Sequence, residues 1–273
     1  MKQKHQREQK KADERILSLV ASGVQINRFV IPKYFDLSTN RDLLLDCDYI
    51  YNANDIKLVV RWFHNAIPEP IYQWIPEKRI RHVAEQFKQS FDMNYVSDAT
   101  DPYTKFRAVR IRNPQPSMSG TYTCDISSLA GQSTHASSVY IYASPKSFDF
   151  YSKFNEERGD LQLECIAKDV YPLPVLTLSK HVHHISPTTD RTEKVTESSV
   201  TDNDETIIVS SQNESASIEM NANTSLYKIS VKHIINRDDL LRTSTMRSQL
   251  VFECDLQIPN TNYRKRKRIT LYS

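Results

Sequence analysis

The chain has 273 residues, of which 39% are hydrophobic and 10% are aromatic, so it is long enough for two domains with packed cores. Its formal net charge is only +3, and each of its four glycines stands alone in the sequence. Isolated glycines exclude glycine-rich phosphate loops and the glycine-flanked serine of α/β hydrolases, so we expect no nucleotide. We also expect no enzymatic activity and no cofactor, and a protein rather than nucleic acid as the partner.

The first 24 residues are predicted to form a basic, disordered tail. Positions 1–15 hold six lysines and arginines against three acidic residues, so they supply the net charge of +3 by themselves. The apolar run at 16–23 has the composition of a short signal-peptide core, but the region before it is long and contains acidic residues. We therefore predict no clear signal peptide, and no apolar run approaches the roughly 20 residues of a membrane span.

The four cysteines all lie in runs that predict β-strands, and none has the short spacing of zinc or redox sites. Their order suggests one disulfide per domain, Cys47 with Cys124 and Cys165 with Cys254, at separations of 77 and 89 residues. Disulfides imply an oxidising compartment. The alternative is four buried free cysteines in a cytosolic protein.

A tryptophan lies between the first two cysteines. Trp62 follows Cys47 by fifteen residues, and its indole would pack on a disulfide that joins two sheets. This arrangement is typical of immunoglobulin domains, so residues 25–143 are predicted to form one. The separation of the cysteines leaves room for extra strands, which favours the variable type, and residues 71–75 would supply one of them.

The stretch SGTYTCD at 119–125 has the features of a tyrosine corner. Tyr122 lies two positions before Cys124, so both side chains would enter the same core. We predict that the Tyr122 hydroxyl bonds back to the chain before the strand, and that Gly120 permits the tight turn there.

Residues 145–273 are predicted to form a second, constant-like immunoglobulin domain. Leu176 or Leu178 would take the place of the tryptophan, and Phe252, two positions before Cys254, would replace the corner tyrosine. The fold class is therefore all-β, with two tandem immunoglobulin-like β-sandwiches.

A polar stretch at about 186–224 explains the longer cysteine separation of the second domain. It is rich in Ser, Thr, Asn and acidic residues, and we predict an extended loop or disordered insert. The stretch contains Asn213-Glu214-Ser215 and Asn223-Thr224-Ser225, so Asn213 and Asn223 are candidate glycosylation sites if the chain is secreted.

Two further clusters have alternative interpretations. His181 and His183 would share one face of a strand and could hold zinc together, but no third ligand is near in sequence, so we favour a solvated strand end and predict no metal site. The second cluster could contact a polyanion weakly or protect an edge strand by its charge, and we favour the edge strand. It consists of Arg264, Lys265, Arg266, Lys267 and Arg268.

Strand alternation suggests a protein-binding patch on the first domain. With Trp62 pointing inward, Arg61 and Phe63 point outward. Tyr72 and Trp74 share one face of the added strand, and we predict that they join Arg61 and Phe63 in an interface of the kind that uses aromatic and arginine anchors. The alternative is that Trp74 folds over the sheet edge as additional core.

The stretches at 47–51, 58–63, 71–76 and 119–124 together resemble the insect beaten-path family of immunoglobulin proteins. The resemblance covers about residues 25–273, strongly in the first domain and weakly in the second. It implies a neuronal surface or secreted protein that acts in axon guidance by binding a sidestep-type immunoglobulin receptor.

The sequence therefore predicts an extracellular recognition or adhesion protein, secreted or attached to the cell surface. An intracellular or structural immunoglobulin module is the alternative, and free cysteines in the native protein would favour it.

Overall fold

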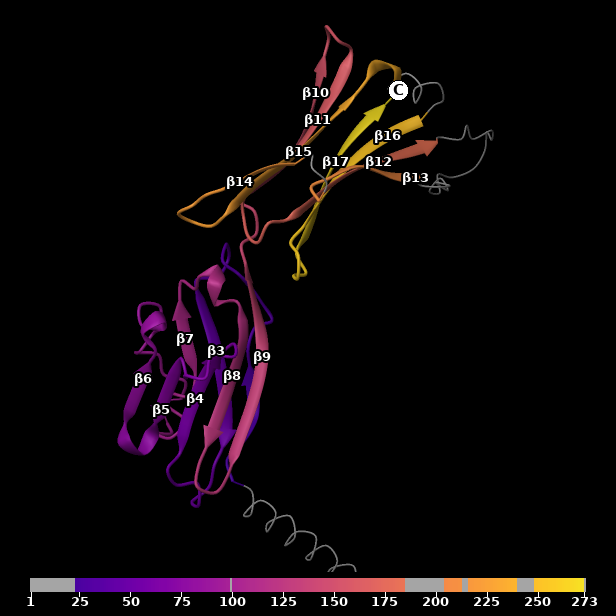
Figure 1. Ribbon diagram of the computed structural model, residues 1–273. Helices are drawn as coiled ribbons and strands as arrows, with labels where there is room; N and C mark the ends of the chain where they lie inside the picture. The colour runs from indigo at the N-terminus through magenta and orange to yellow at the C-terminus, as the bar shows by residue number, and fades with distance from the viewer. Residues whose placement is uncertain (1–22, 99, 185–203, 213–215, 240–247, 273) are drawn as a thin grey trace, which may run out of the picture. The chain divides into compact units, whose positions relative to one another are not determined.

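The computed structural model describes residues 23–98, 100–184, 204–212, 216–239 and 248–272. The chain divides between Ile141 and Tyr142 into two compact units (Figure 1). This division lies close to the predicted boundary at 143–145. The predicted disordered tail at 1–24 lies outside the described residues except for its last two positions.

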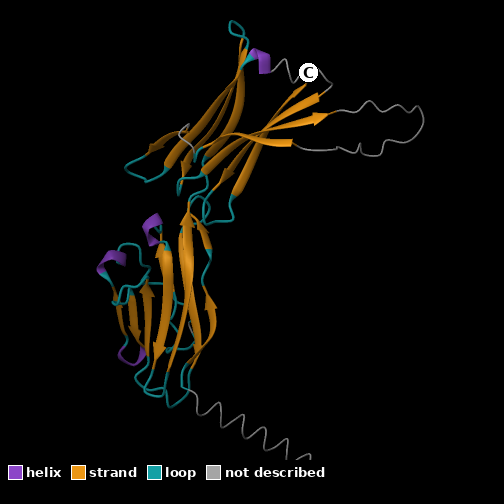
Figure 2. Cartoon of the chain, turned by 45° about the vertical axis from the view of Figure 1, so that its right-hand side comes forward, coloured by secondary structure: helices purple, strands orange, loops and turns teal. Residues whose placement is uncertain are grey.

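The first unit is a sandwich of two sheets (Figure 2). The smaller sheet has the strand order β1-β3-β7, and the larger has the order β2-β9-β8-β4-β5-β6. The two strands beyond β4 are those that a variable-type domain adds, and β5 covers most of the strand predicted at 71–75. The strands are β1 (Gln25–Val30), β2 (Tyr34–Asp36), β3 (Asp42–Ile50), β4 (Val59–His64), β5 (Tyr72–Ile75), β6 (Ile80–Val83), β7 (Val109–Arg112), β8 (Gly120–Ser127) and β9 (Gln132–Tyr142). Short 3-10 helices lie at η1 (Pro76–Lys78), η2 (Glu85–Phe87) and η3 (Pro116–Met118).

Trp62 lies in the core of the first unit. It pairs with Cys124 in the β4–β8 register, and Cys124 is bonded to Cys47 on β3 of the other sheet, as predicted. The side chain of Trp62 is fully buried, its Nε1 donates a hydrogen bond to the Arg107 carbonyl oxygen at 2.8 Å, and Phe29 stacks on it with ring centroids 6.0 Å apart. The disulfide and the indole therefore join the two sheets in one place.

The tyrosine corner is present. The Tyr122 hydroxyl donates a hydrogen bond to the Met118 carbonyl oxygen at 2.7 Å, and burial raises the pKa of this phenol. Gly120 has a φ of 148°, which side chains rarely adopt, and an added Cβ would collide with the side chain of Asn65. Glycine is thus required at the turn for two independent reasons.

The second unit is also a two-sheet sandwich. One sheet has the order β10-β11-β15-β14, which matches the four-stranded sheet of a constant-type domain, and the other has the order β13-β12-β16-β17. The strands are β10 (Ser147–Asn155), β11 (Asp160–Val170), β12 (Val175–His184), β13 (Asp204–Ser210), β14 (Ala216–Met220), β15 (Tyr227–Ile235), β16 (Ser248–Gln257) and β17 (Arg264–Tyr272).

The structure corrects the predicted polar insert at 186–224. Within it, β13 pairs with β12 and β14 pairs with β15, so this part is neither a loop nor disordered. The β-branched run at 206–209 explains β13, which its polar neighbours concealed in the sequence. A constant-type domain has three strands in this sheet, and β13 adds a fourth, so the second unit differs from the constant-like pattern that the sequence predicted. Residues 185–203 and 213–215 lie outside the described parts of the chain.

The core of the second unit repeats the plan of the first with different side chains. Cys165 and Cys254 form the predicted disulfide. Leu178, rather than Leu176, pairs with Cys254 and so occupies the position that Trp62 has in the first unit. Phe252 is fully buried, which agrees with its predicted role as a replacement for the corner tyrosine.

His64, at the end of β4, is a buried histidine in the first unit. It packs against the rings of Tyr122 and Phe87, with ring centroids 4.7 and 5.8 Å away, and only 6% of the residue is exposed. Burial lowers the pKa of His64, and its hydrogen bonding to the Ser119 carbonyl oxygen opposes this shift only in part. The folded domain therefore favours the neutral imidazole.

We expect the free energy of unfolding of the first unit to decrease as the pH falls below about 6.5, the ordinary pKa of histidine. Below this pH the imidazole of His64 binds a proton more readily in the unfolded chain than in the folded one. The stability that the neutral His64 contributes is therefore fully present at higher pH and decreases as the pH falls from about 6.5 to the lower pKa of His64 in the folded state. One group limits the slope to about 1.4 kcal/mol per pH unit. Both tryptophans lie in the first unit, so tryptophan fluorescence during denaturant unfolding measures it. Equal slopes for the wild type and His64→Asn would contradict the expectation.

Candidate protein-binding surface

The larger sheet of the first unit has one side turned away from the core, which we call the outer face. Its members alternate along the strands with buried residues. Arg61 and Phe63 are partly exposed and belong to this face, as predicted, because Val60, Trp62 and His64 between and beside them are buried. The outer face is defined by Val59, Arg61, Phe63, Gln73, Ile75, Ile80, His82 and Asp125.

Tyr72 and Trp74 do not belong to the outer face, and their predicted role as partner-binding residues is wrong. They are 1% and 2% exposed, respectively. In the β4–β5 register Tyr72 pairs with Trp62 and Trp74 pairs with Val60, and paired residues of antiparallel strands point to the same side of a sheet. Both aromatic side chains therefore share the inward direction of Trp62.

The two side chains are fixed in the core by neighbours from the loop before β7. The Tyr72 hydroxyl donates a hydrogen bond to the Phe106 carbonyl oxygen at 2.9 Å, and burial raises the pKa of Tyr72. The Trp74 indole meets the Phe106 ring edge to face, with centroids 5.9 Å apart. The alternative of Trp74 as additional core is thus the correct one.

The centre of the outer face is a polar network around Asp125 on β8. Arg61 Nη1 lies 3.3 Å from Asp125 Oδ1 and donates a hydrogen bond to Ser127 Oγ at 3.0 Å. Asp125 Oδ2 accepts hydrogen bonds from Thr134 Oγ1, at 2.9 Å, and from Gln132 Nε2. The Arg61 side chain remains 32% exposed against 11% for Asp125, so the arginine is presented to solvent while its carboxylate partner is covered.

An apolar group lies beside this network. Ile75 on β5 pairs directly with Ile80 on β6, and Ile80 is 51% exposed. Val59, which precedes the buried Val60 on β4, is partly exposed on the same side of the sheet. The prediction from sequence missed Ile75 and Ile80, because it placed the neighbouring Trp74 outward. The opposite alternation of β5 would have indicated Ile75, and Ile80 then follows from its pairing with Ile75.

The other predicted sites are less informative. His181 lies on β12 with Nε2 3.2 Å from Ser179 Oγ. The side chain of His183 is not among those that the structure describes. No group of three or more potential metal ligands occurs among the residues that the structure describes.

Of the two candidate glycosylation sites, Asn223 is exposed in the turn after β14, and Asn213 falls in the undescribed 213–215.

The basic run at 264–268 forms most of β17, which is an edge strand of its sheet. Its arginines pair with acidic residues of the neighbouring β16. Arg266 and Arg268 bind Glu253, at 3.3 and 2.5 Å, and Arg264 binds Asp255 at 2.6 Å. Much of the positive charge is therefore neutralised within the sheet, which favours the edge-strand interpretation over a polyanion site.

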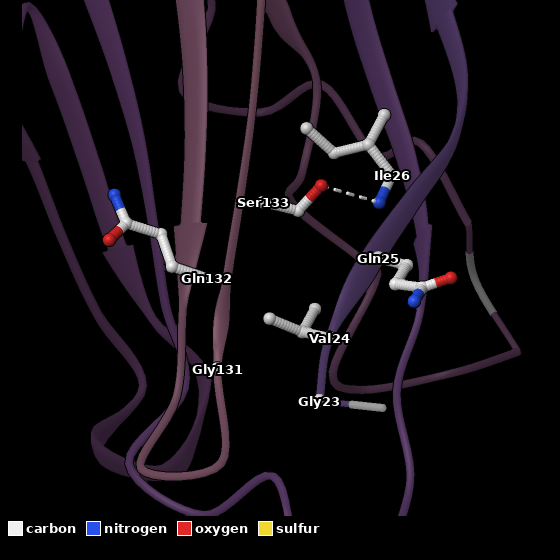
Figure 3. Close-up of a pocket in the computed structure, with 7 residues that line it drawn as sticks. All are labelled: Gly23, Val24, Gln25, Ile26, Gly131, Gln132 and Ser133. Atoms are coloured by element: carbon white, nitrogen blue, oxygen red, sulfur yellow. Dashed lines mark hydrogen bonds between the residues drawn. The ribbon is translucent and has the colours of Figure 1, made fainter. Parts of the chain in front are cut away.

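A cavity of about 370 Å³ lies between residues 23–26 and 131–133 of the first unit (Figure 3). The backbone approaches closely there, since a Cβ added to Gly23 would lie 2.7 Å from the Gly131 nitrogen. The Ile26 amide donates a hydrogen bond to Ser133 Oγ at 3.1 Å across the opening. Its lining side chains carry no charge, so the outer face is the stronger candidate for a functional surface.

The architecture defines an all-β protein of two tandem immunoglobulin-like sandwiches, each closed by one disulfide. A crystal structure of bovine butyrophilin is similar, with a TM-score of 0.56 and 15% sequence identity over 92% of this chain and 99% of that chain. At this identity the similarity shows the fold. No protein-family model and no curated protein matches the sequence. In the described parts of the chain, no helix has the length and apolar character to cross a bilayer.

Replacement of Trp74 by alanine is expected to reduce stability rather than to remove a binding anchor. Loss of a fully buried tryptophan costs about 3–5 kcal/mol of unfolding free energy. Ile75→Ala at the adjacent, outward position is the control and should cost clearly less, since Ile75 is partly exposed on the outer face and lies outside the core between the sheets. Denaturant unfolding followed by fluorescence of Trp62 measures both. Equal stability of the two variants would contradict the assignment of Trp74 to the core.

Proposed function

We propose that the chain is an extracellular recognition protein whose first domain binds a protein partner through the outer face. The observation that carries this proposal is the position of a partly exposed, fixed arginine, Arg61, on the same sheet face as the exposed apolar side chain of Ile80. Binding hot spots are enriched in arginine and aromatic residues, and apolar contacts supply much of the affinity around them. Phe63, two positions from Arg61 on β4, adds an aromatic group.

The extracellular location is supported by the cysteines. All four are paired, and disulfides persist in oxidising compartments rather than in the cytosol. The alternative of an intracellular immunoglobulin module would be favoured by free thiols, and no free cysteine occurs.

The charge balance of the outer face suggests what kind of partner surface it fits. Arg61 is offset by Asp125, so the centre of the face is close to neutral. We infer a partner surface that is mainly apolar with hydrogen-bonding groups rather than strongly acidic. The resemblance to the beaten-path family suggests a sidestep-type immunoglobulin receptor and a role in axon guidance.

Binding to the ectodomain of a sidestep-type receptor, measured by surface plasmon resonance with the two-domain protein, tests the proposal. We expect Ile80→Asp and Arg61→Ala each to weaken binding about thirtyfold, which corresponds to the roughly 2 kcal/mol of a hot-spot residue. Arg61→Ala should leave the fold intact, because Asp125 keeps its hydrogen bonds from Thr134 and Gln132.

Ile50→Asp is the matched control. Ile50 is 49% exposed, against 51% for Ile80, but it lies on β3 of the smaller sheet. Affinity lost in Ile50→Asp and retained in Ile80→Asp and Arg61→Ala would show that the outer face is the wrong surface. Absence of binding by the wild type would reject the receptor class.

A further inference from the structure

Among its described strands, the second unit has four edge strands, β10 and β14 in one sheet and β13 and β17 in the other. An edge strand exposes unpaired backbone groups that can pair with another chain, and proteins usually protect such edges with charges, prolines or inward-pointing lysines. β17 follows this rule. Lys267 of β17 pairs with the inward Cys254 in register, and its Nζ lies 3.1 Å from Asp149 Oδ1 of β10.

β14 lacks this protection. Its sequence, ASIEM, has one charged residue, Glu219, whose charge is offset by Lys228 of the adjacent β15 at 3.1 Å. Ile218 and Met220 are 46% and 58% exposed. Among the described residues, no strand pairs with the outer edge of β14. It is therefore a short, apolar edge without the usual barrier to self-association.

The chain leaves β14 through a defined turn that carries a glycosylation acceptor. Asn223 lies three residues after Met220 and is exposed. The turn is closed by hydrogen bonds from the Ser225 amide to the Asn221 carbonyl oxygen at 2.8 Å and from the Asn221 amide to the Leu226 carbonyl oxygen at 2.9 Å. Since three residues span at most about 11 Å, a sugar chain on Asn223 would start within reach of the β14 edge.

We propose that an N-linked glycan on Asn223 covers the apolar edge of β14 and prevents edge-to-edge association of two copies of the chain. The inference rests on the proposed passage of the protein through the secretory pathway. There, a transferase would join Asn223 Nδ2 to the anomeric carbon of a lipid-diphosphate-linked oligosaccharide. Nδ2 loses a proton, the bond from that carbon to the phosphate oxygen breaks, and the lipid diphosphate leaves. The glycan would thus protect the edge of β14, as charged side chains protect the edge of β17.

The test uses the full chain secreted from animal cells behind a heterologous leader. Glycopeptide mapping should find Asn223 occupied, and light scattering after gel filtration should find the protein monomeric. Asn223→Gln should self-associate at concentrations at least tenfold lower than the wild type. Adding Ile218→Lys to this variant should restore the monomer, because a lysine on the edge opposes strand pairing.

Ile234→Lys in the Asn223→Gln background is the matched control. Ile234 is 50% exposed on β15, an inner strand of the same sheet, so this lysine should not restore the monomer. An unoccupied Asn223, a monomeric Asn223→Gln variant, or equal rescue by the two lysines would each overturn the inference. Receptor binding by Asn223→Gln reports on the outer face separately, so failure of this inference is distinguishable from failure of the proposed function.

Discussion

The bond between Cys47 and Cys124 fixes which side of the larger sheet faces inward. Cys124 must reach the other sheet, and its register partner Trp62 therefore points the same way. The β4–β5 register passes this direction on to Tyr72 and Trp74. The outer face consists of the positions left over, so one covalent constraint determines both the composition of the core and the surface offered to a partner.

Sequence alone was sufficient for features that depend on spacing within one strand or on the pairing of cysteines. The order of cysteines, tryptophan and tyrosine gave the two sandwiches, the pairing of sulfurs and the tyrosine corner of Tyr122. It also placed Arg61 and Phe63 correctly, since they flank Trp62 on the same strand. Two positions of one strand have a fixed relative direction, and no tertiary information is needed.

Features that depend on register between strands were beyond the sequence. The stretch at 71–75 is apolar or aromatic at four of five positions, so either alternation would bury large side chains. Only pairing with β4 decides the direction, and it places Tyr72 and Trp74 in the core, against the prediction. The choice of Leu178 over Leu176 likewise depends on pairing with Cys254. β13 and β14 escaped detection because they are short and flanked by polar residues.

The network around Asp125 bears on the kinetics of the proposed complex. Binding a flexible arginine ordinarily costs about 0.5–1.5 kcal/mol of side-chain entropy, because its rotamers become fixed on association. Arg61 is already held by Asp125 and Ser127 in the free protein, so most of this loss has occurred during folding. A contact preorganised in this way contributes more of its interaction energy to the affinity. Affinity differences between related complexes lie mainly in the dissociation rate, so we expect the bound complex to have a longer lifetime.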